Sequence, residues 1–306
     1  MACQVSGFPA HGGQSAAAPA AEPNGSGSVQ SPNRPPHSSG LRPPPPRILI
    51  FYREHRRFIR GAYTIGLALL AWELAGRYLL TSKLMFAPFS AVMAEFGKLW
   101  VTGELQQDMI VSFTELAAGL AISAVVGVVI GSLIAVSNVV GEHFDPLINA
   151  LYATPLVAFS PILILVFGIG PPAIVAIVFL LAVFPIIINT TAGIRGTDAS
   201  LIEAAQSFGA SRFEVFRLVR LPSALSFIVA GLRLGIGRGL VGVFVGELSG
   251  ARRGLGYLIS VSSQVFNVPA MFVGILILAA SGVVCVAVLE YIEIKIAPWR
   301  QFELKA

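Results

Sequence analysis

Charged side chains interrupt several long runs of apolar residues. Arg233, Arg238 and Glu247 lie in the run from about 223 to 248, and Glu115 lies in an earlier run. Charge inside a bilayer is costly, so such groups usually face the protein interior or a water-filled path. Arg238 is the deepest of them, and it can either pair with a carboxylate such as Glu115 or present positive charge to an anion. Glu247, near the end of its run, can receive a solute or fix the outer mouth. Arg238, Glu115 and Glu247 are therefore candidate residues of a translocation pathway.

The sequence contains few of the residue patterns that are typical of enzymes. It contains no convergent set of acid, base and nucleophile, and its four histidines are scattered, without metal-ligand spacing. The two cysteines do not form a disulfide framework. No GxxxxGKS/T phosphate-binding motif occurs, so any nucleotide hydrolysis must come from a partner. We therefore expect a protein that is not an enzyme and that binds no metal or cofactor directly.

The composition is that of a membrane protein. Of 306 residues, 55% are hydrophobic and 12% are charged, and the mean hydropathy is +0.77. Soluble domains carry about 25% charged residues. A net charge of +5 and a pI near 9.5 are compatible with nucleic-acid binding, but that function needs a basic face on a folded domain. Here the basic residues flank apolar runs, which indicates a role in membrane topology and no nucleic-acid partner.

Six apolar runs are long enough to cross a bilayer, which takes roughly 20 residues. An all-α membrane protein with six transmembrane helices is therefore the expected fold, with an interfacial helix from Pro88 to Trp100. The six runs cover about 62–80, 111–137, 145–168, 171–192, 223–248 and 268–291.

The segments before and around these runs divide the chain further. Residues 1–47 are rich in Pro, Gly and Ser, and we expect this tail to be disordered because it cannot bury enough apolar area to offset its ordering entropy. Residues 48–61 form a basic juxtamembrane segment, and 62–299 form the transmembrane domain. Lys and Arg near the ends of the runs favour a cytoplasmic location for both termini and for the loop at 200–222. The expected location is the inner (cytoplasmic) membrane.

Glycines recur at helical spacing in two of the runs. Such stripes allow another backbone to approach closely. They indicate either plain helix packing or a sliding interface between subunits. The glycines concerned are Gly235, Gly239, Gly242 and Gly246 in the fifth run, and Gly119, Gly127 and Gly131 in the second.

A polar stretch, 200–222, separates the fourth and fifth runs. Ser200 with Glu203, and Ser211 with Glu214, have the spacing of helix-capping boxes. Gly209 lies between them and is expected to end one short helix before the next begins. Pro222 is expected in the first turn of the helix that follows. The stretch thus predicts two short helices joined by a bend.

The same stretch resembles the EAA loop of ABC importer permeases. The resemblance rests on Glu203-Ala204-Ala205, Gly209 and Leu221-Pro222 at the family's spacing, with Val219 where the family usually has Ile. From about 111 to 299 the chain is similar to the nitrate/sulfonate/taurine branch of this family. The strings that carry the similarity include FDPLINALYATPLVAFSPILILVFGIG and IVAGLRLGIGRGLVGVFVGEL.

The resemblance implies a type I importer assembly. The permease would pair with a second copy, two ATPase subunits that use ATP and Mg, and an extracytoplasmic solute-binding protein. Glu203, Ala204, Ala205 and Gly209 would form the core of the surface that docks on the ATPase. The solute would be a small anion such as a sulfonate, taurine or nitrate, or alternatively a pyrimidine-like vitamin precursor. The rival interpretation, an ATP-independent secondary transporter or channel, leaves the spacing in 200–222 as coincidence.

Overall fold

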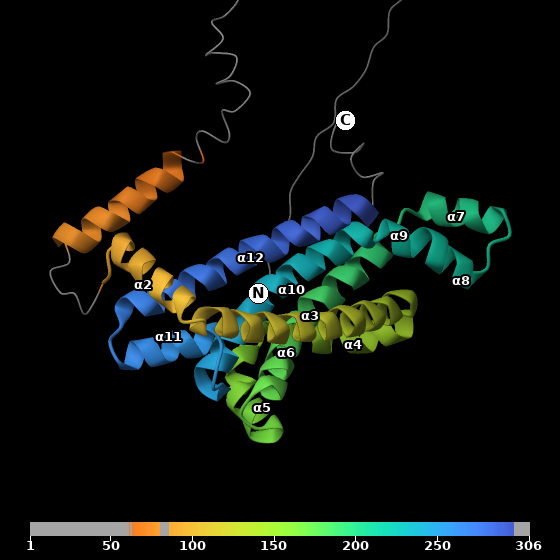
Figure 1. Ribbon diagram of the computed structural model, residues 1–306. Coiled ribbons are helices and arrows are strands. Elements are labelled where there is room, and N and C mark those ends of the chain that lie inside the picture. The colour runs from red at the N-terminus through yellow and green to blue at the C-terminus, as the bar shows by residue number, and fades with distance from the viewer. Residues whose placement is uncertain (1–60, 62, 80–85, 297–306) are drawn as a thin grey trace, which may run out of the picture. The chain divides into compact units, whose positions relative to one another are not determined.

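The computed structural model describes residues 61, 63–79 and 86–296. All of them belong to one unit, Arg57–Ala306, and they form helices and turns without a strand. The expected tail at 1–47 and most of the basic segment at 48–61 lie outside the described residues. Residues 63–74 form a helix that continues as the π-helical turn η1 (Ala75–Leu79). The later elements are α2 (Phe89–Val101), α3 (Glu104–Val136), α4 (Asn138–Ala153), η2 (Leu156–Phe159), α5 (Ser160–Phe167), α6 (Pro171–Arg195), α7 (Ala199–Ser207), α8 (Arg212–Val215), η3 (Phe216–Arg220), α9 (Leu221–Ser223), α10 (Leu225–Gly250), α11 (Leu255–Gln264) and α12 (Val268–Ile296) (Figure 1).

Four of these helices, α3, α6, α10 and α12, are long and apolar enough to cross a membrane, counting the residues that the structure describes. They confirm four of the six predicted spans. The predicted span at 62–80 lies partly outside the described residues. The span at 145–168 is not one straight helix, because its two halves, Val139–Ala153 and Leu156–Phe167, meet at 83°.

The break in the third span occurs at Thr154 and Pro155. Thr154 has ψ 143, which is extended backbone, as expected for a residue before proline. Pro161 lies in the first turn of α5, where its missing N–H costs nothing. Pro185 is the proline that lies inside a spanning helix, α6.

Helix α6 is the centre of the packing. Its apolar stretch is 61% buried, the highest value among the four spanning helices. Side chains of Ile177, Leu181 and Ile187 join Ile134 of α3 and Leu156 of η2 in the largest buried cluster. Since this helix contacts both α3 and α10, it sets their positions.

The glycine stripes of α3 and α10 both pack on α6. A Cβ added at Gly127 would lie 2.7 Å from Ile186, and one at Gly235 would lie 3.3 Å from the same side chain. Val178 of α6 likewise packs between Gly119 of α3 and Gly242 of α10. The stripes therefore provide close helix packing within one chain, which is the simpler of the two interpretations that the sequence left open.

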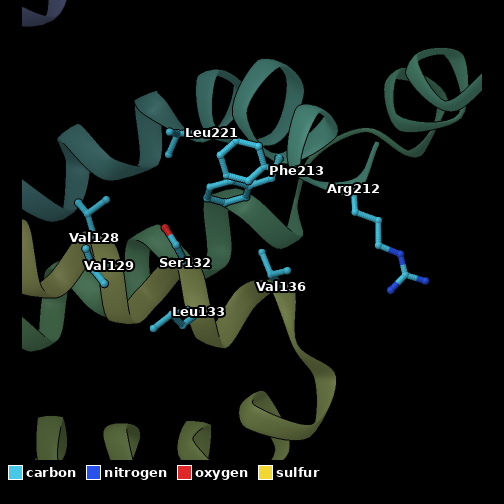
Figure 2. A pocket seen from close by; sticks show the side chains of 9 residues that line it. Val128, Val129, Ser132, Leu133, Val136, Arg212, Phe213 and Leu221 are labelled. Carbon is cyan, nitrogen blue, oxygen red and sulfur yellow. The ribbon is translucent and has the colours of Figure 1, made fainter. Parts of the chain in front are cut away.

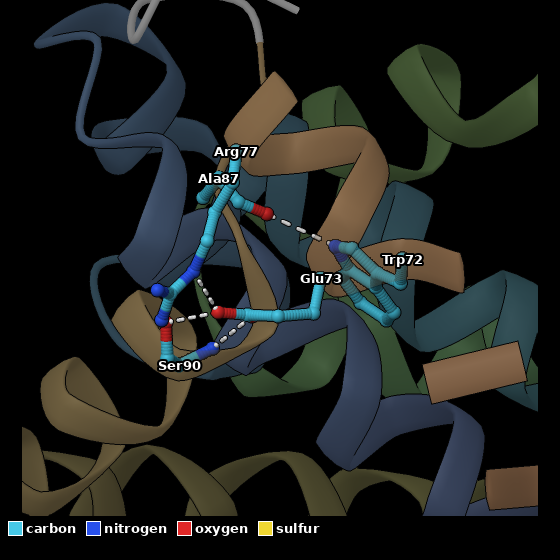
Figure 3. A network of polar contacts seen from close by, with 5 residues as sticks. All are labelled: Trp72, Glu73, Arg77, Ala87 and Ser90. Atoms are coloured by element: carbon cyan, nitrogen blue, oxygen red, sulfur yellow. Dashed lines mark hydrogen bonds and ion pairs between the residues drawn. The ribbon is translucent and has the colours of Figure 1, made fainter. Parts of the chain in front are cut away.

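Hydrogen bonds attach the helix at 63–79 to the start of α2. The carboxylate of Glu73 accepts hydrogen bonds from the backbone N–H of Ser90 at 2.9 Å and from its hydroxyl at 2.8 Å, and it pairs with Arg77 (Figure 3). Trp72 Nε1 donates to the carbonyl of Ala87 at 2.9 Å. A helix, α2, is thus present where the sequence predicted one, and it is anchored to the element before it. Its interfacial position stays a prediction.

Candidate functional site

The loop between α6 and α10 begins with a capped helix. Asp198 caps α7, its carboxylate accepting a hydrogen bond at 2.9 Å from the backbone N–H of Ser200. This bond holds the pKa of Asp198 below its usual value. The predicted capping box of Ser200 with Glu203 is therefore wrong. The helix begins at Ala199, one residue before Ser200, so Ser200 lies inside the first turn.

Gly209 makes the bend that the sequence predicted. Its φ is +83°, a left-handed conformation that L side chains rarely adopt. The N–H of Gly209 donates to the carbonyl of Gln206 at 2.9 Å, and the N–H of Ala210 donates to that of Ala205 at 3.1 Å. These bonds close α7 in the manner of a C-terminal glycine cap. Apart from Gly209 itself and its two chain neighbours, no atom of the described residues lies within 4 Å of where a Cβ on Gly209 would be.

The second half of the loop is held by a complete capping box, as predicted. Ser211 Oγ accepts from the N–H of Glu214 at 3.3 Å, and the carboxylate of Glu214 accepts from the N–H of Ser211 at 2.8 Å. The latter bond lowers the pKa of Glu214. The chain then passes through the π-helical turn η3, which the sequence did not predict, into α9, where Leu221 and Pro222 form the first turn as expected.

The loop presents apolar side chains to its surroundings. Phe208 is 93% exposed beside the bend, and Phe213 is 70% exposed on α8. Glu203, Ala204 and Gly209 are also exposed, and Ala205 is half-buried. The predicted docking residues thus share one rigid, uncovered segment. Phe208 extends this surface, and its position next to a bend-forming glycine is the signal in the sequence that marks it.

A second polar cluster lies at the far end of α10. Glu247 is fully buried, and its carboxylate accepts hydrogen bonds from Ser112 Oγ at 2.5 Å and from the N–H of Gly256 at 2.6 Å. The N–H of Leu255 donates to Ser112 Oγ at 2.8 Å. Glu247 therefore fixes the turn between α10 and α11. Its two predicted roles, receiving a solute and fixing the outer mouth, stay predictions.

Helix α3 provides the partners for that turn. Ser112 and Asp108 lie one helical turn apart, and Asp108 accepts from the N–H of Gly254 at 3.0 Å. Sequence reasoning missed both residues, although Asp108, Ser112 and Glu115 follow the i, i+4, i+7 spacing of one helix face. Glu115 is buried against Glu247.

Arg238 does not pair with Glu115, so the first of its two predicted alternatives is wrong. Its guanidinium carbon lies 4.3 Å from the centre of the Tyr152 ring, a cation–π contact between α10 and α4. Among the described residues no carboxylate forms an ion pair with it. Arg233, in contrast, pairs with Glu290 at 3.1 Å. Arg238 thus lies in a helix long and apolar enough to span a membrane, and no acid of the described residues neutralises its charge.

Comparisons with known proteins decide the family. The model of the binding-protein-dependent transport system inner membrane component family matches residues 124–298, which is more than half of the chain. The chain belongs to this family of ABC importer permeases. As the fold implies, it is a multi-pass membrane protein, and its relatives are transport subunits, with the ATPase of the system on a separate chain.

Several relatives match over most of their length. A Bacillus subtilis protein named as an aliphatic sulfonates transport permease, SsuC, is 30% identical over 81% of this chain and 90% of its own. The formylaminopyrimidine transport permease ThiX of Halalkalibacterium halodurans is 31% identical, covering 76% of this chain and 92% of its own. The taurine transport permease TauC of Escherichia coli is 27% identical, covering 77% and 88%.

The fold agrees with a solved importer. A chain of the MetNI methionine ABC transporter, in inward-facing conformations, superposes with a TM-score of 0.50 at 22% identity. The match covers 60% of this chain and 92% of that one. The shared part is thus nearly the whole of the other permease.

Proposed function

We propose that this permease forms, with a second copy of itself, the membrane pathway of an importer that takes up a small organic or inorganic anion. Two ATPase subunits using ATP and Mg would drive it, and an extracytoplasmic solute-binding protein would deliver the solute. The observation that carries the proposal is the rigid loop at 199–223, with its exposed docking residues, in a chain of this family.

The loop is built to transmit motion. A segment that converts closure of an ATPase pair into movement of membrane helices must be stiff, and the ATPase must bind it. The caps at Asp198 and Ser211 stiffen it, because each satisfies a backbone N–H at a helix start that has no partner within the helix. Phe208 offers apolar area to a cleft on the ATPase. We infer that ATP-driven closure moves the loops of both copies and so alternates access to the pathway.

The nature of the solute is inferred from Arg238. Its guanidinium carries a charge with no acid partner among the described residues, and Tyr152 holds it in place. A sulfonate or nitrate group can accept hydrogen bonds from such a guanidinium. Two relatives are named for sulfonates and taurine, both of which carry this kind of acidic group.

A second candidate solute is a pyrimidine-like vitamin precursor. ThiX, named for formylaminopyrimidine, matches 76% of this chain at 31% identity. The taurine permease matches 77% of this chain at 27% identity. An uptake assay with taurine, an alkanesulfonate and formylaminopyrimidine, in cells lacking their own systems, separates the two candidates. Dependence on ATP hydrolysis, and not on an ion gradient, excludes a secondary transporter.

The coupling role is tested by Gly209→Arg. Arginine at φ +83° strains the bend, and its side chain fills the docking surface. Tagged protein is extracted from membranes in mild detergent, and the proteins bound to it are identified by mass spectrometry. We expect an ATPase subunit with the unmodified chain and its loss with the variant.

Gly103→Arg is the matched control. Gly103 has φ +80° and, like Gly209, no atom within 4 Å of an added Cβ, but it lies between α2 and α3, away from the loop. This variant should retain the ATPase. Equal retention by both variants would contradict the coupling role of the loop.

A further inference from the structure

An apolar cavity separates the coupling loop from the end of α3. It has a volume of about 530 Å³. Val129, Leu133 and Val136 of α3 form one wall, and Phe213 faces them from the loop (Figure 2). Phe216 also lines the cavity. The guanidinium of Arg212 extends away from these side chains, so the cavity is apolar inside and basic at its edge.

A second cavity, of about 430 Å³, adjoins the first. The two share Val136, which lines both. Arg195 from the end of α6 and Arg220 from η3 supply the charge of the second cavity, and no acidic residue lines it. The π-helical turn creates this arrangement, since it places Phe216 in the apolar cavity and Arg220, four residues later, in the basic one.

The two arginines differ in their ion-pair and hydrogen-bond partners. Arg195 Nη1 pairs with Asp145 at 2.7 Å, and its Nη2 donates to the carbonyl of Ile134 at 3.2 Å. Arg220 forms no ion pair with the described residues, and its Nε is buried without a hydrogen-bond partner among them. A buried donor without an acceptor is unfavourable. Arg220 thus brings to the second cavity a charge that no acid among the described residues pairs with. A phosphate group would supply that negative charge together with hydrogen-bond acceptors.

The position of the cavities indicates where that phosphate comes from. Val129, Leu133 and Val136 are 52%, 61% and 52% exposed in the chain, and they occupy the last turns of a spanning helix. An apolar wall at the end of a span, next to a basic pocket, lies at the boundary between acyl chains and headgroups. We propose that the two cavities together bind one anionic phospholipid, with an acyl chain against α3 and the phosphate between Arg195 and Arg220.

This proposal requires only that α3 crosses a bilayer. It does not depend on which solute the permease transports. A bound lipid would bridge α3, α6 and η3, and would brace the loop against the spans that it has to move. The site would make the loop sensitive to the content of anionic lipid in the membrane.

Quenching of tryptophan fluorescence by lipids with brominated acyl chains tests the proposal. The full chain carrying Leu133→Trp is reconstituted in vesicles, and the signal of its three native tryptophans is subtracted with the unmodified chain. We expect brominated phosphatidylglycerol, mixed into phosphatidylcholine, to quench about five-fold more effectively than the same fraction of brominated phosphatidylcholine. About 1 kcal/mol for one basic contact corresponds to this ratio. Leu165→Trp, on α5 and 86% exposed outside both cavities, should give a ratio near one.

Variants at η3 identify the headgroup contact. In the Leu133→Trp background, Arg220→Gln should abolish the preference for the anionic lipid, and Arg220→Lys should keep it. Arg217→Gln removes a neighbouring charge that lines neither cavity and should also leave the preference intact. Gel filtration of each variant shows whether it is folded.

Three outcomes would overturn the proposal. Equal quenching by the two lipids at Leu133→Trp would mean an ordinary lipid-facing surface. No quenching by either lipid would mean that protein, such as a second copy of the chain, covers the groove. Loss of the preference in inorganic phosphate, but not in chloride at the same ionic strength, would mean a site for free phosphate and not for lipid.

Discussion

The carboxylate of Glu247 stabilises the turn between α10 and α11. Gly254, in this turn, has φ +123°, and a Cβ on it would collide with that carboxylate. Glu247 and Asp108 each accept a backbone N–H from the segment 254–256. The acid and the glycine therefore fit each other, and together they set where α11 begins.

Gly254→Ala tests this fit. Strain at a positive φ, together with displacement of a buried carboxylate, should lower the free energy of unfolding by at least about 2 kcal/mol. Loss of helical circular dichroism on heating in mild detergent measures it. Gly237→Ala is the control, because no atom lies within 4 Å of its added Cβ in α10, and alanine there should be neutral or stabilising. Equal melting temperatures would mean that the turn is not held in this way.

Arg238 is the residue on which the nature of the solute depends. Removing a charge that binds the solute directly should cost about 1.5–3 kcal/mol of binding, or about ten-fold or more in the KM for uptake. We therefore expect Arg238→Ala to reduce uptake of an anionic solute without preventing assembly, and Arg238→Lys to retain more of it. Unchanged uptake by a variant that still copurifies with its ATPase would mean that Arg238 serves packing against Tyr152.

At the scale of elements, the coupling loop is held mainly by local bonds. Its bend, its second cap and its re-entry at Pro222 follow rules that act over a few residues, and the sequence therefore predicted them. Other contacts depend on residues far apart in the chain. Ser112 and Glu247 meet across 135 positions, and Tyr152 of α4 contacts Arg238 of α10. No spacing in the sequence contains that information, which explains why the pairing of Arg238 was predicted wrongly.

The capping box predicts how the loop responds to acid. Since its bond to Ser211 lowers the pKa of Glu214 from 4.5 in the folded state, this carboxylate stabilises the loop fully above pH 4.5. That contribution is lost as the pH falls through the lowered value. Hydrogen exchange of the segment 211–216, measured by mass spectrometry, should show more protection in the unmodified chain than in Glu214→Gln at pH 7. The difference should vanish in stronger acid. A difference that persists once the carboxylate is protonated would show that the charge of Glu214 is not what holds the cap.

At the scale of the whole molecule, α10 separates the two polar sites. Its 26 residues span about 39 Å at 1.5 Å per residue, more than the roughly 30 Å of a bilayer interior. The coupling loop and the turn at 251–254 must then face opposite sides. The distribution of Lys and Arg predicts that the loop side is cytoplasmic, which is also the side where ATP is available.

Labelling of single cysteines in intact cells tests this orientation. The native Cys3 and Cys285 are replaced by serine, and one cysteine is introduced at an exposed position on each side. Arg252→Cys, in the turn after α10, should react with a membrane-impermeant maleimide in intact cells. Glu142→Cys, where α4 follows the end of α3 beside the loop, should react only after permeabilisation. A cytoplasmic ATPase can reach the loop only in this orientation, because the bilayer would otherwise separate them. The reverse labelling pattern would therefore exclude the coupling role of the loop as well as the predicted topology.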